Sequence, residues 1–344
     1  MKTLLLHADG IEEAAALLRK GEPVGMPTET VYGLACDAGN PDAVRKVFAA
    51  KGRPADNPLI VHIADLADWA PLVKEIPPLA HRLAERFWPG PLTVILPRSE
   101  RIPSVTAGGL DSVGVRFPAH PLAQELIRVS GLPLAAPSGN RSGSPSPTTA
   151  QHMLDDMDGR IPAILDGGSC ICGVESTVIS LEDDCTVRVL RPGFVTPEQL
   201  GTVAERVIVD QAVLAQVAAG TVVRSPGMKY KHYAPAAAVT LLQGDRAHIL
   251  AYLKERQGAD IYALVFDADM KACRASGIRA VPYGDSDEAR AALFFARLRE
   301  LDACGAKHIY VRAPRTDGVG LAVYNRLIRA AGYDVVQTDP HGRE

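Results

Sequence analysis

Residues 40–63 read NPDAVRKVFAAKGRPADNPLIVHI, and this stretch decides the fold class of the N-terminal part of the chain. It opens on Asn40 followed by proline, a combination typical of a helix start, and its helical pattern stops at Gly52. A charged loop follows, and residues 59–63 form a short apolar run that is typical of a buried strand. The stretch therefore predicts a helix, a loop and a strand. Whether the charged loop is a connector or binds a ligand depends on the rest of the chain.

The same alternation of helix and strand extends in both directions from this stretch. Helical patterns cover residues 11–20, 77–88, 120–131 and 148–157, and short apolar runs typical of strands lie between them. Because helices and strands alternate along the chain, the sequence predicts an α/β domain over residues 1–215.

The chain changes character over residues 216–238. This stretch is rich in proline, glycine, lysine and aromatic residues and has neither helical nor alternating periodicity, so we interpret it as an interdomain linker. Strand and helix patterns alternate again over residues 239–344, which predicts a smaller Rossmann-like domain with a parallel sheet. No G-x-G-x-x-G follows the first strand of that domain, so the sequence does not support a dinucleotide site there.

Composition argues against several classes of protein. The net charge of −3 argues against general binding to nucleic acid or to acidic membranes. No apolar run approaches the roughly 20 residues that span a bilayer, and charges interrupt the N-terminal apolar patch too early for a signal peptide. The six cysteines include one C-x-C pair with no second pair at metal spacing, so no protein-bound metal is expected. These features predict a cytoplasmic protein that does not bind membranes.

Six polar clusters lie at the ends of the predicted strands in the first domain. They supply hydroxyl groups, loops of serine and glycine, and four cations, which are Lys51, Arg53, Arg116 and Arg191. Ligands of open α/β sheets gather at strand ends, and these cations suit phosphate and carboxylate groups. The clusters favour a substrate with several phosphates. The alternative is that each arginine pairs with a surface carboxylate and that the loops only connect strands.

Several stretches of the chain together resemble a known family. They are PTETVYGLACDA (27–38), KGRPADNPLIVHI (51–63), FWPGPLTVIL (87–96), VGVRFPAHP (113–121), APSGNRSGSPSPT (136–148), GVESTVISL (173–181) and LRPG (190–193). Over nearly all of residues 10–240 the chain resembles the YrdC-like family in its long, two-domain form, the threonylcarbamoyl-AMP synthases. The hallmark K-x-R and S-x-N pairs are unbroken, as Lys51 with Arg53 and Ser138 with Asn140. The resemblance implies a twisted mixed-sheet α/β domain with a basic cavity.

The resemblance also implies a reaction. L-threonine, bicarbonate and ATP are expected to give threonylcarbamoyl-AMP, pyrophosphate and water, with Mg²⁺ bound to the phosphates of ATP. The product is expected to reach a transferase partner that modifies an adenosine of tRNA. Stable direct binding of nucleic acid by this chain is not expected.

Site residues follow from the same resemblance. Catalysis is expected to use Lys51, Arg53, Ser138 and Asn140. The ATP site is expected to contain Arg53, Asn57, Ser112, Ser138, Ser146, Arg191 and Tyr230. The threonine site is expected to contain Thr30, His62, Arg116, Ala136 and Ser176, with Arg116 pairing the carboxylate of threonine. Residues 216–238 are also a candidate lid over the nucleotide, and the sequence names no general base.

Two other functions stay open at this point. One is an enzyme of the same fold that makes carbamoyl-AMP and needs no threonine. The other is a non-catalytic RNA-binding module that uses the basic cavity. Acidic residues outnumber basic ones over residues 1–220, and aromatic stacking motifs are absent, which both count against the RNA-binding module.

Overall fold

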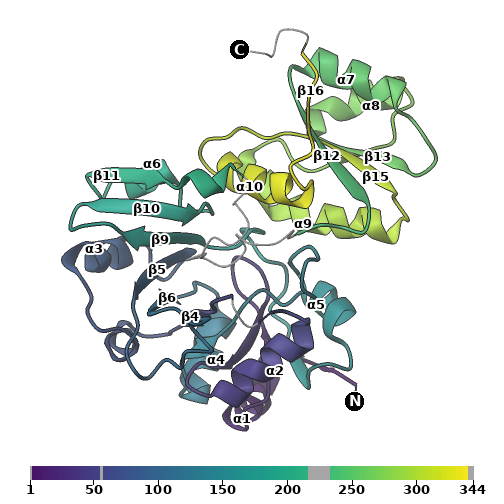
Figure 1. The fold of residues 1–344 in the computed structure, drawn as a ribbon. Helices are drawn as coiled ribbons and strands as arrows, with labels where there is room; N and C mark the ends of the chain where they lie inside the picture. Colours follow the sequence, from purple (N-terminus) through teal and green to yellow (C-terminus); the bar gives the residue numbers. More distant parts are fainter. Residues whose placement is uncertain (1, 55–56, 216–232, 340–344) are drawn as a thin grey trace. The chain divides into compact units, whose positions relative to one another are not determined.

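The computed structural model describes residues 2–54, 57–215 and 233–339, which belong to two compact units (Figure 1). The first unit takes in Met1–Ser142 and Ser146–Lys229, and the second takes in Gly143–Pro145 and Tyr230–Glu344. Tyr230 and most of the predicted linker and lid lie outside the described residues. Each unit has its own sheet and is described separately below.

The first unit is built on an eleven-stranded sheet with the order β1-β8-β2-β3-β7-β4-β6-β5-β9-β10-β11. Parallel pairs such as β4 with β6 lie beside antiparallel pairs such as β5 with β6, so the predicted mixed sheet is confirmed. The strands are β1 (Leu4–Leu6), β2 (Val24–Met26), β3 (Gly33–Asp37), β4 (Ile60–His62), β5 (Leu92–Pro97), β6 (Ser112–Arg116), β7 (Leu134–Ala135), β8 (Ala163–Leu165), β9 (Thr177–Leu181), β10 (Thr186–Arg191) and β11 (Arg206–Val209).

The helices of the first unit begin and end at the residues that favour those positions. They are α1 (Ile11–Arg19), α2 (Pro41–Lys51), α3 (Pro78–Phe87), α4 (Pro121–Ser130), α5 (Ala150–Met157) and α6 (Pro197–Leu200). At the start of α2 the Asn40 side chain accepts the backbone N–H groups of Asp42 and Ala43. At its end Gly52 has a φ of 62°, a left-handed conformation that costs glycine little. The charged loop therefore starts at the point that the sequence predicts.

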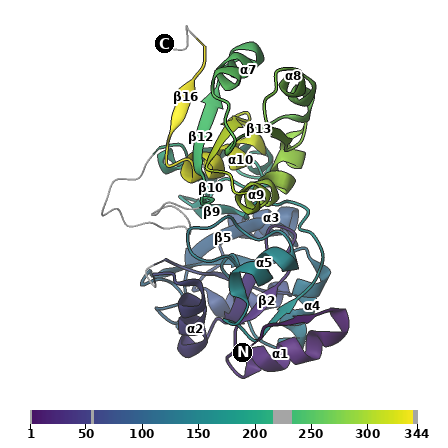
Figure 2. The same ribbon diagram turned by 90° about the vertical axis from the view of Figure 1, so that its right-hand side faces the viewer.

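Both faces of this sheet are covered by apolar side chains. Consecutive residues of β3 show the alternation, because Leu34 packs with Val44 of α2, whereas Ala35 packs with Ala14 of α1 and Leu126 of α4. Helices α2 and α4 accordingly lie on either side of β2 in Figure 2. The loops at the strand ends, rather than the faces of the sheet, are left to carry polar groups.

The second unit contains a parallel sheet of five strands, ordered β14-β13-β15-β12-β16. This confirms the predicted Rossmann-like architecture. Its strands are β12 (Ala238–Gln243), β13 (Ile261–Val265), β14 (Ala280–Pro282), β15 (His308–Arg312) and β16 (Val335–Gln337). Its helices are α7 (Arg246–Glu255), α8 (Met270–Ala275), α9 (Asp287–Ala303) and α10 (Gly320–Ala330).

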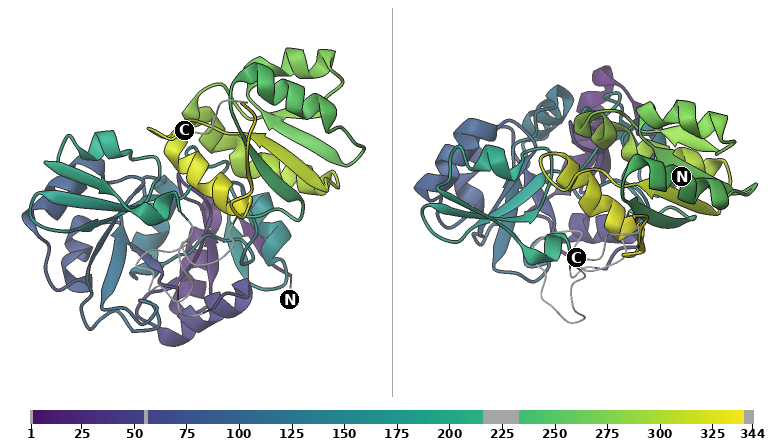
Figure 3. Two further views of the ribbon diagram at one scale, coloured as in Figure 1. Left: turned by 45° about the horizontal axis from the view of Figure 1, so that its top comes forward. Right: turned by 90° about the horizontal axis from the view of Figure 1, so that it is seen from above.

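The helices of the second unit divide between the two faces of its sheet (Figure 3). Ile249 of α7 and Cys273 of α8 share one apolar cluster with Val265 of β13, and α9 contacts α10. Right-handed crossovers require this division, because the chain moves in one direction along the sheet through α7 and α8 and returns through α9 and α10.

Two strands are not predicted by the sequence. β1 and β11 lie at the two edges of the eleven-stranded sheet. Leu4 and Leu5 of β1 are 48% and 42% exposed, so a run of three leucines does not show the pattern of a buried strand. Within the described ranges, we find no helix with the length and apolar character needed to cross a membrane.

Candidate active site

Lys51, the last residue of α2, is a buried cation held by backbone oxygens. Its side-chain ammonium group donates hydrogen bonds to the main-chain oxygens of Ser138 and Asn140, the second at 2.6 Å. Burial lowers the pKa of Lys51 well below its usual range, the charge of Arg53 lowers it further, and two carboxylates oppose this with smaller effects. Among the described residues its recorded hydrogen-bond partners are carbonyl groups rather than carboxylates, so an anionic ligand would relieve the cost of its charge.

The second hallmark pair is in contact with the first. The Ser138 hydroxyl donates to Oδ1 of Asn140 at 2.6 Å. Nη2 of Arg53 lies 3.4 Å from the main-chain oxygen of Asn57, in the loop that follows α2. The structure thus brings Lys51, Ser138 and Asn140 together and places Arg53 close enough to act on the charge of Lys51.

Two further serines predicted for the ATP site lie in different surroundings. The Ser146 hydroxyl donates a short hydrogen bond to the carboxylate of Glu175, whose charge also acts on Lys51. Ser112 begins β6 and lines a small cavity together with Pro58, the residue after Asn57. Ser146 is therefore connected to Lys51 through Glu175, and Ser112 lines the same small cavity as Pro58 of the charged loop.

Arg116, the last residue of β6, is the centre of a second group. It is 4% exposed, and its Nη1 donates to the hydroxyl of Thr30 at 2.9 Å. Its Nε donates to the main-chain oxygen of Gly90 at 3.3 Å, and Nη2 lies 2.7 Å from Oε1 of Glu29. Because Thr30 and Glu29 belong to the loop between β2 and β3, Arg116 fixes that loop against the sheet.

His62 faces Arg116 across the β4–β6 pair. Burial, followed by the charge of Arg116, lowers the pKa of His62 to about 3. Its Nδ1 lies 3.3 Å from the main-chain oxygen of Leu134. His62 is therefore a neutral imidazole at neutral pH, and it can offer a ligand a hydrogen bond but not a positive charge.

Ser176 and Arg191 complete this second group. The Ser176 hydroxyl lies 2.8 Å from that of Thr93, and Nη2 of Arg191 donates to it at 3.1 Å. Thr93 faces Arg116 across the β5–β6 pair, which connects Ser176 to the arginine. Arg191, predicted for the ATP site, thus contacts a residue predicted for the threonine site. The backbone N–H of Ala136 donates a hydrogen bond to the main-chain oxygen of Ile60 in β4 at 3.0 Å.

Three residues near these groups were given no role in the sequence analysis. Glu29 and Glu175 stand next to the predicted Thr30 and Ser176, so each motif already contains them, but neighbours in sequence need not share a site. Thr93 carries no sequence signal at all, because a threonine in a strand is ordinary. Only its pairing with Arg116 and its contact with Ser176 reveal it.

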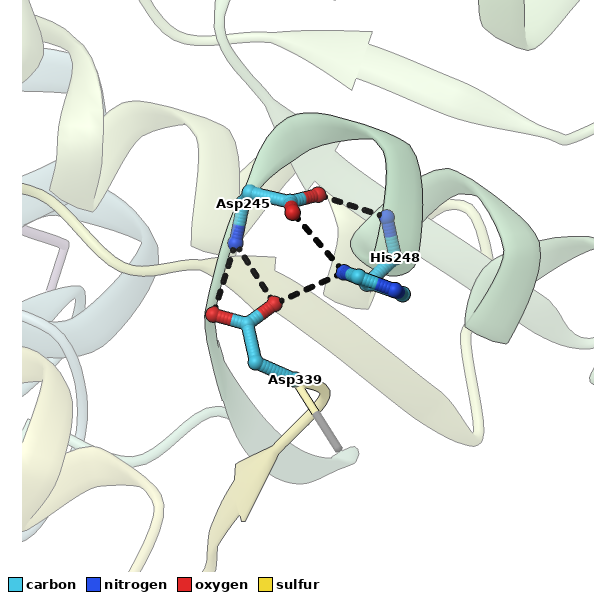
Figure 4. A group of neighbouring side chains, drawn as sticks. All are labelled: Asp245, His248 and Asp339. Carbon is cyan, nitrogen blue, oxygen red and sulfur yellow. Dashed lines mark hydrogen bonds and ion pairs between the residues drawn. The ribbon is translucent and has the colours of Figure 1, made fainter. Parts of the chain in front are cut away.

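A group with metal-ligand atoms close together lies in the second unit (Figure 4). His248 Nδ1 is 2.8 Å from an oxygen of Asp245 and 3.0 Å from an oxygen of Asp339. Asp245 also caps α7 by accepting the His248 N–H, and the Asp245 N–H donates to both oxygens of Asp339. These bonds already explain the group as the cap of α7. In the part of the chain that the structure describes, no such group surrounds Lys51.

Known proteins are similar to this chain along most of its length. Residues 16–193 match the Sua5, YciO and YrdC family, described as telomere recombination, and residues 195–332 match the C-terminal domain of threonylcarbamoyl-AMP synthase. The threonylcarbamoyl-AMP synthase of Pyrococcus abyssi is 43% identical over 336 residues, 95% of each chain. That of Bacillus subtilis is 46% identical over 335 residues, 95% of this chain and 94% of its own.

A solved structure agrees with these relatives. The crystal structure of P. abyssi Sua5 complexed with L-threonine is 41% identical in sequence and has a TM-score of 0.88 to the present structure. The alignment covers 98% of this chain and 100% of the other. The similarity therefore extends over both units.

Proposed function

This chain belongs to the threonylcarbamoyl-AMP synthase family, and we propose that it joins L-threonine, bicarbonate and ATP into threonylcarbamoyl-AMP, with release of pyrophosphate and water. It is an enzyme of the nucleotidyltransferase kind. We assign the chemistry to residues 1–215. One observation supports this most strongly. The unit contains two buried cations in different surroundings, because Lys51 is hydrogen-bonded to carbonyl oxygens and Arg116 is paired with a carboxylate.

The reaction divides into two balanced steps. The ammonium group of threonine first releases a proton to solvent, and the resulting amine adds to bicarbonate. A C–N bond forms, a C–O bond of bicarbonate breaks, and water leaves to give the carbamate. A carbamate oxygen then attacks the α-phosphorus of ATP, and the bond from that phosphorus to the bridging oxygen breaks, so that pyrophosphate leaves with the electron pair. Positioning and neutralisation of charge are the main contributions that a protein makes to such a displacement.

The Lys51 group has the properties that the second step needs. Its lowered pKa means that a positive charge at this position is costly until an anion arrives. The triphosphate of ATP would supply that anion, and Arg53 would add a second cation with a planar, bidentate group. Ser138 and Asn140 would hold the loop in place through their mutual hydrogen bond and their bonds to Lys51.

The Arg116 group has the properties of a threonine site. Its guanidinium can pair with the carboxylate of the substrate, while Thr30, Ser176 and neutral His62 offer hydrogen-bonding groups nearby. Arg191 contacts Ser176, so the threonine site and the predicted ATP site share an edge, as a reaction between the two substrates requires.

We further propose Mg²⁺ as the companion of ATP rather than a resident metal. Magnesium keeps several waters and binds mainly to substrate phosphates, so few ligands from the protein are expected. The mixed anhydride product is labile, so we expect a transferase that modifies tRNA to consume it in the cytoplasm.

The decisive experiment measures pyrophosphate release from ATP by the purified chain, with and without L-threonine and bicarbonate. Release that requires both is the expected result. Release that ignores threonine would instead favour a carbamoyl-AMP-forming enzyme. Tight tRNA binding with a steep salt dependence and no turnover would favour the RNA-binding alternative.

A matched pair of variants locates the site. We expect Lys51→Ala to lower pyrophosphate release by about 100- to 1,000-fold, because it removes a buried cation at the phosphate position. Lys46→Ala is the control, since Lys46 lies on the same helix, is 44% exposed and pairs with Glu22 at the surface. If the two variants released pyrophosphate at the same rate, Lys51 would not be part of the active site.

A further inference from the structure

Glu29 carries a buried carboxylate whose hydrogen-bonding capacity is not used. Its side chain is 8% exposed, and Oε1 lies 2.7 Å from Nη2 of Arg116. Neither carboxylate oxygen receives a hydrogen bond of good geometry among the described residues. A buried carboxylate ordinarily accepts several hydrogen bonds, so this arrangement requires an explanation.

The described residues around Glu29 do not supply the missing hydrogen bonds. The backbone N–H groups of Thr30 and Val31, which follow Glu29, both donate to the hydroxyl of Thr28. The Cys172 N–H donates to the main-chain oxygen of Glu29, not to its side chain. Two thiols also lie near Glu29, and burial, helped by the charge of Glu29, raises the pKa of Cys172 to about 12 and also that of Cys170. Thiols are neutral at pH 7 and are weak donors.

Arg116 and Glu29 therefore present one positive and one negative group side by side in a buried place. An amino acid is a zwitterion with the complementary pair of charges at a fixed separation. Its carboxylate matches the guanidinium, and its ammonium carries three N–H donors that match the unsatisfied carboxylate. A zwitterion also adds no net charge to the site, so binding it costs less than binding an ion of either sign.

We propose that Glu29 is the residue that binds the α-ammonium group of L-threonine. The inference rests on the proposed function and adds to it a specificity-determining residue. Glu29 selects an α-amino acid over a hydroxy acid of the same shape, and it holds the amine that is to be carbamoylated. A purely structural role, in which Glu29 only neutralises Arg116, predicts no such selection.

Calorimetric titration tests this with two ligands and three proteins. The ligands are L-threonine and 3-hydroxybutyrate, in which hydrogen replaces the α-ammonium group. The proteins are the full-length wild type, Glu29→Gln, and Glu22→Gln as a surface control. We expect Glu29→Gln to weaken L-threonine binding by about tenfold to 100-fold, the range for loss of a charge-assisted hydrogen bond, and to change 3-hydroxybutyrate binding by less than about threefold.

The comparison between ligands makes the result specific. Glu29→Gln that weakens both ligands equally, or neither, overturns the inference, because the effect would not involve the ammonium group. If Glu29→Gln does not fold, Glu29→Asp takes its place, since it keeps the charge but withdraws it by one methylene. The expected loss is again larger for L-threonine than for 3-hydroxybutyrate, and equal losses overturn the inference.

The same data separate this inference from the proposed function. Wild-type protein that neither binds L-threonine nor releases pyrophosphate in its presence overturns both. Wild-type protein that does both, beside a Glu29→Gln variant with unchanged ligand preference, overturns only the role of Glu29.

Discussion

The two units bury charged side chains in different ways. In the second unit, the Asp269 carboxylate is 2% exposed and accepts Arg246 at 2.8 Å and Arg312 at 2.6 Å. In the first unit, Lys51 is hydrogen-bonded to carbonyl oxygens, and the carboxylate of Glu29 pairs with Arg116 but receives no hydrogen bond of good geometry among the described residues. Burial is similar in the two places, but the Asp269 carboxylate accepts hydrogen bonds from both of its guanidinium partners, whereas the Glu29 carboxylate accepts none of good geometry from Arg116.

This difference distinguishes structural charge from functional charge. A buried group whose partners are all supplied by the chain stabilises one arrangement of the chain, and substitution is expected to change stability. A buried charged group without enough hydrogen-bond partners lowers the stability of the fold. Such groups are typical of sites where a ligand supplies the missing partner. The comparison therefore supports the proposal that the Lys51 and Arg116 groups bind ligands. Four predictions test it, from the largest expected effect to the smallest.

Asp269→Asn should break the matched charges of the second unit. We expect it to lower the free energy of unfolding by about 3 kcal/mol, because it leaves two guanidinium groups without their carboxylate. Activity per folded molecule should not change. Urea denaturation and pyrophosphate release measure the two quantities. Asp317→Asn, at an exposed pair with Arg315, is the control and should leave the free energy of unfolding nearly unchanged. Loss of activity with unchanged stability would reverse the assignment of Asp269.

Arg116→Lys should show the opposite behaviour. Lysine keeps the charge but cannot contact Thr30, Gly90 and Glu29 at once or pair with a carboxylate through two N–H groups. We expect the KM for L-threonine to rise about 10- to 100-fold while the KM for ATP changes less than about threefold. Steady-state kinetics with each substrate varied in turn gives both values. A larger rise in the KM for ATP would place Arg116 in the nucleotide site instead.

His62 should make the stability of the protein sensitive to acid. Its pKa is about 3 in the folded protein against 6.5 ordinarily, so between these values the unfolded chain binds more protons and stability falls as the pH falls. At pH 5 the expected loss relative to neutral pH is about 2 kcal/mol. His62→Asn should remove this part of the pH dependence, whereas substitution of the exposed His7 should not. Unfolding midpoints at pH 5 and pH 7 would show it.

Asp339→Asn should have the smallest effect. The carboxylate caps α7 through the backbone N–H of Asp245, and its surroundings are partly exposed. We expect a loss below about 1 kcal/mol in stability and no change in kinetics. Thermal melting with added Zn²⁺ or Mn²⁺ would test whether the group is only a cap: stabilisation of the wild type but not of the variant would identify a metal site.

Much of the fold could be predicted because its signals are local. Asn40 marks the start of α2 through its side chain, and Gly52 marks its end through its backbone conformation. Neither preference depends on distant residues. The parallel sheet of the second unit follows from the alternation of strand and helix patterns. β1 and β11 could not be predicted, because short edge strands are stabilised by the neighbour they pair with rather than by their own pattern.

The candidate site, like the fold, could be predicted from the sequence only in part. The motifs identified the residue types and the hallmark pairs, because close spacing in the sequence keeps Lys51 with Arg53 and Ser138 with Asn140. The class of reaction was implied by the resemblance of these motifs to a known family. Only the tertiary structure decided that Lys51 is held by the carbonyl groups of the second pair and that Thr93 connects Ser176 to Arg116. It also decided that the carboxylate of Glu29 pairs with Arg116 but receives no hydrogen bond of good geometry from the residues that the structure describes. These facts depend on sheet register and on burial, which bring together residues far apart in the chain and set the cost of each charge.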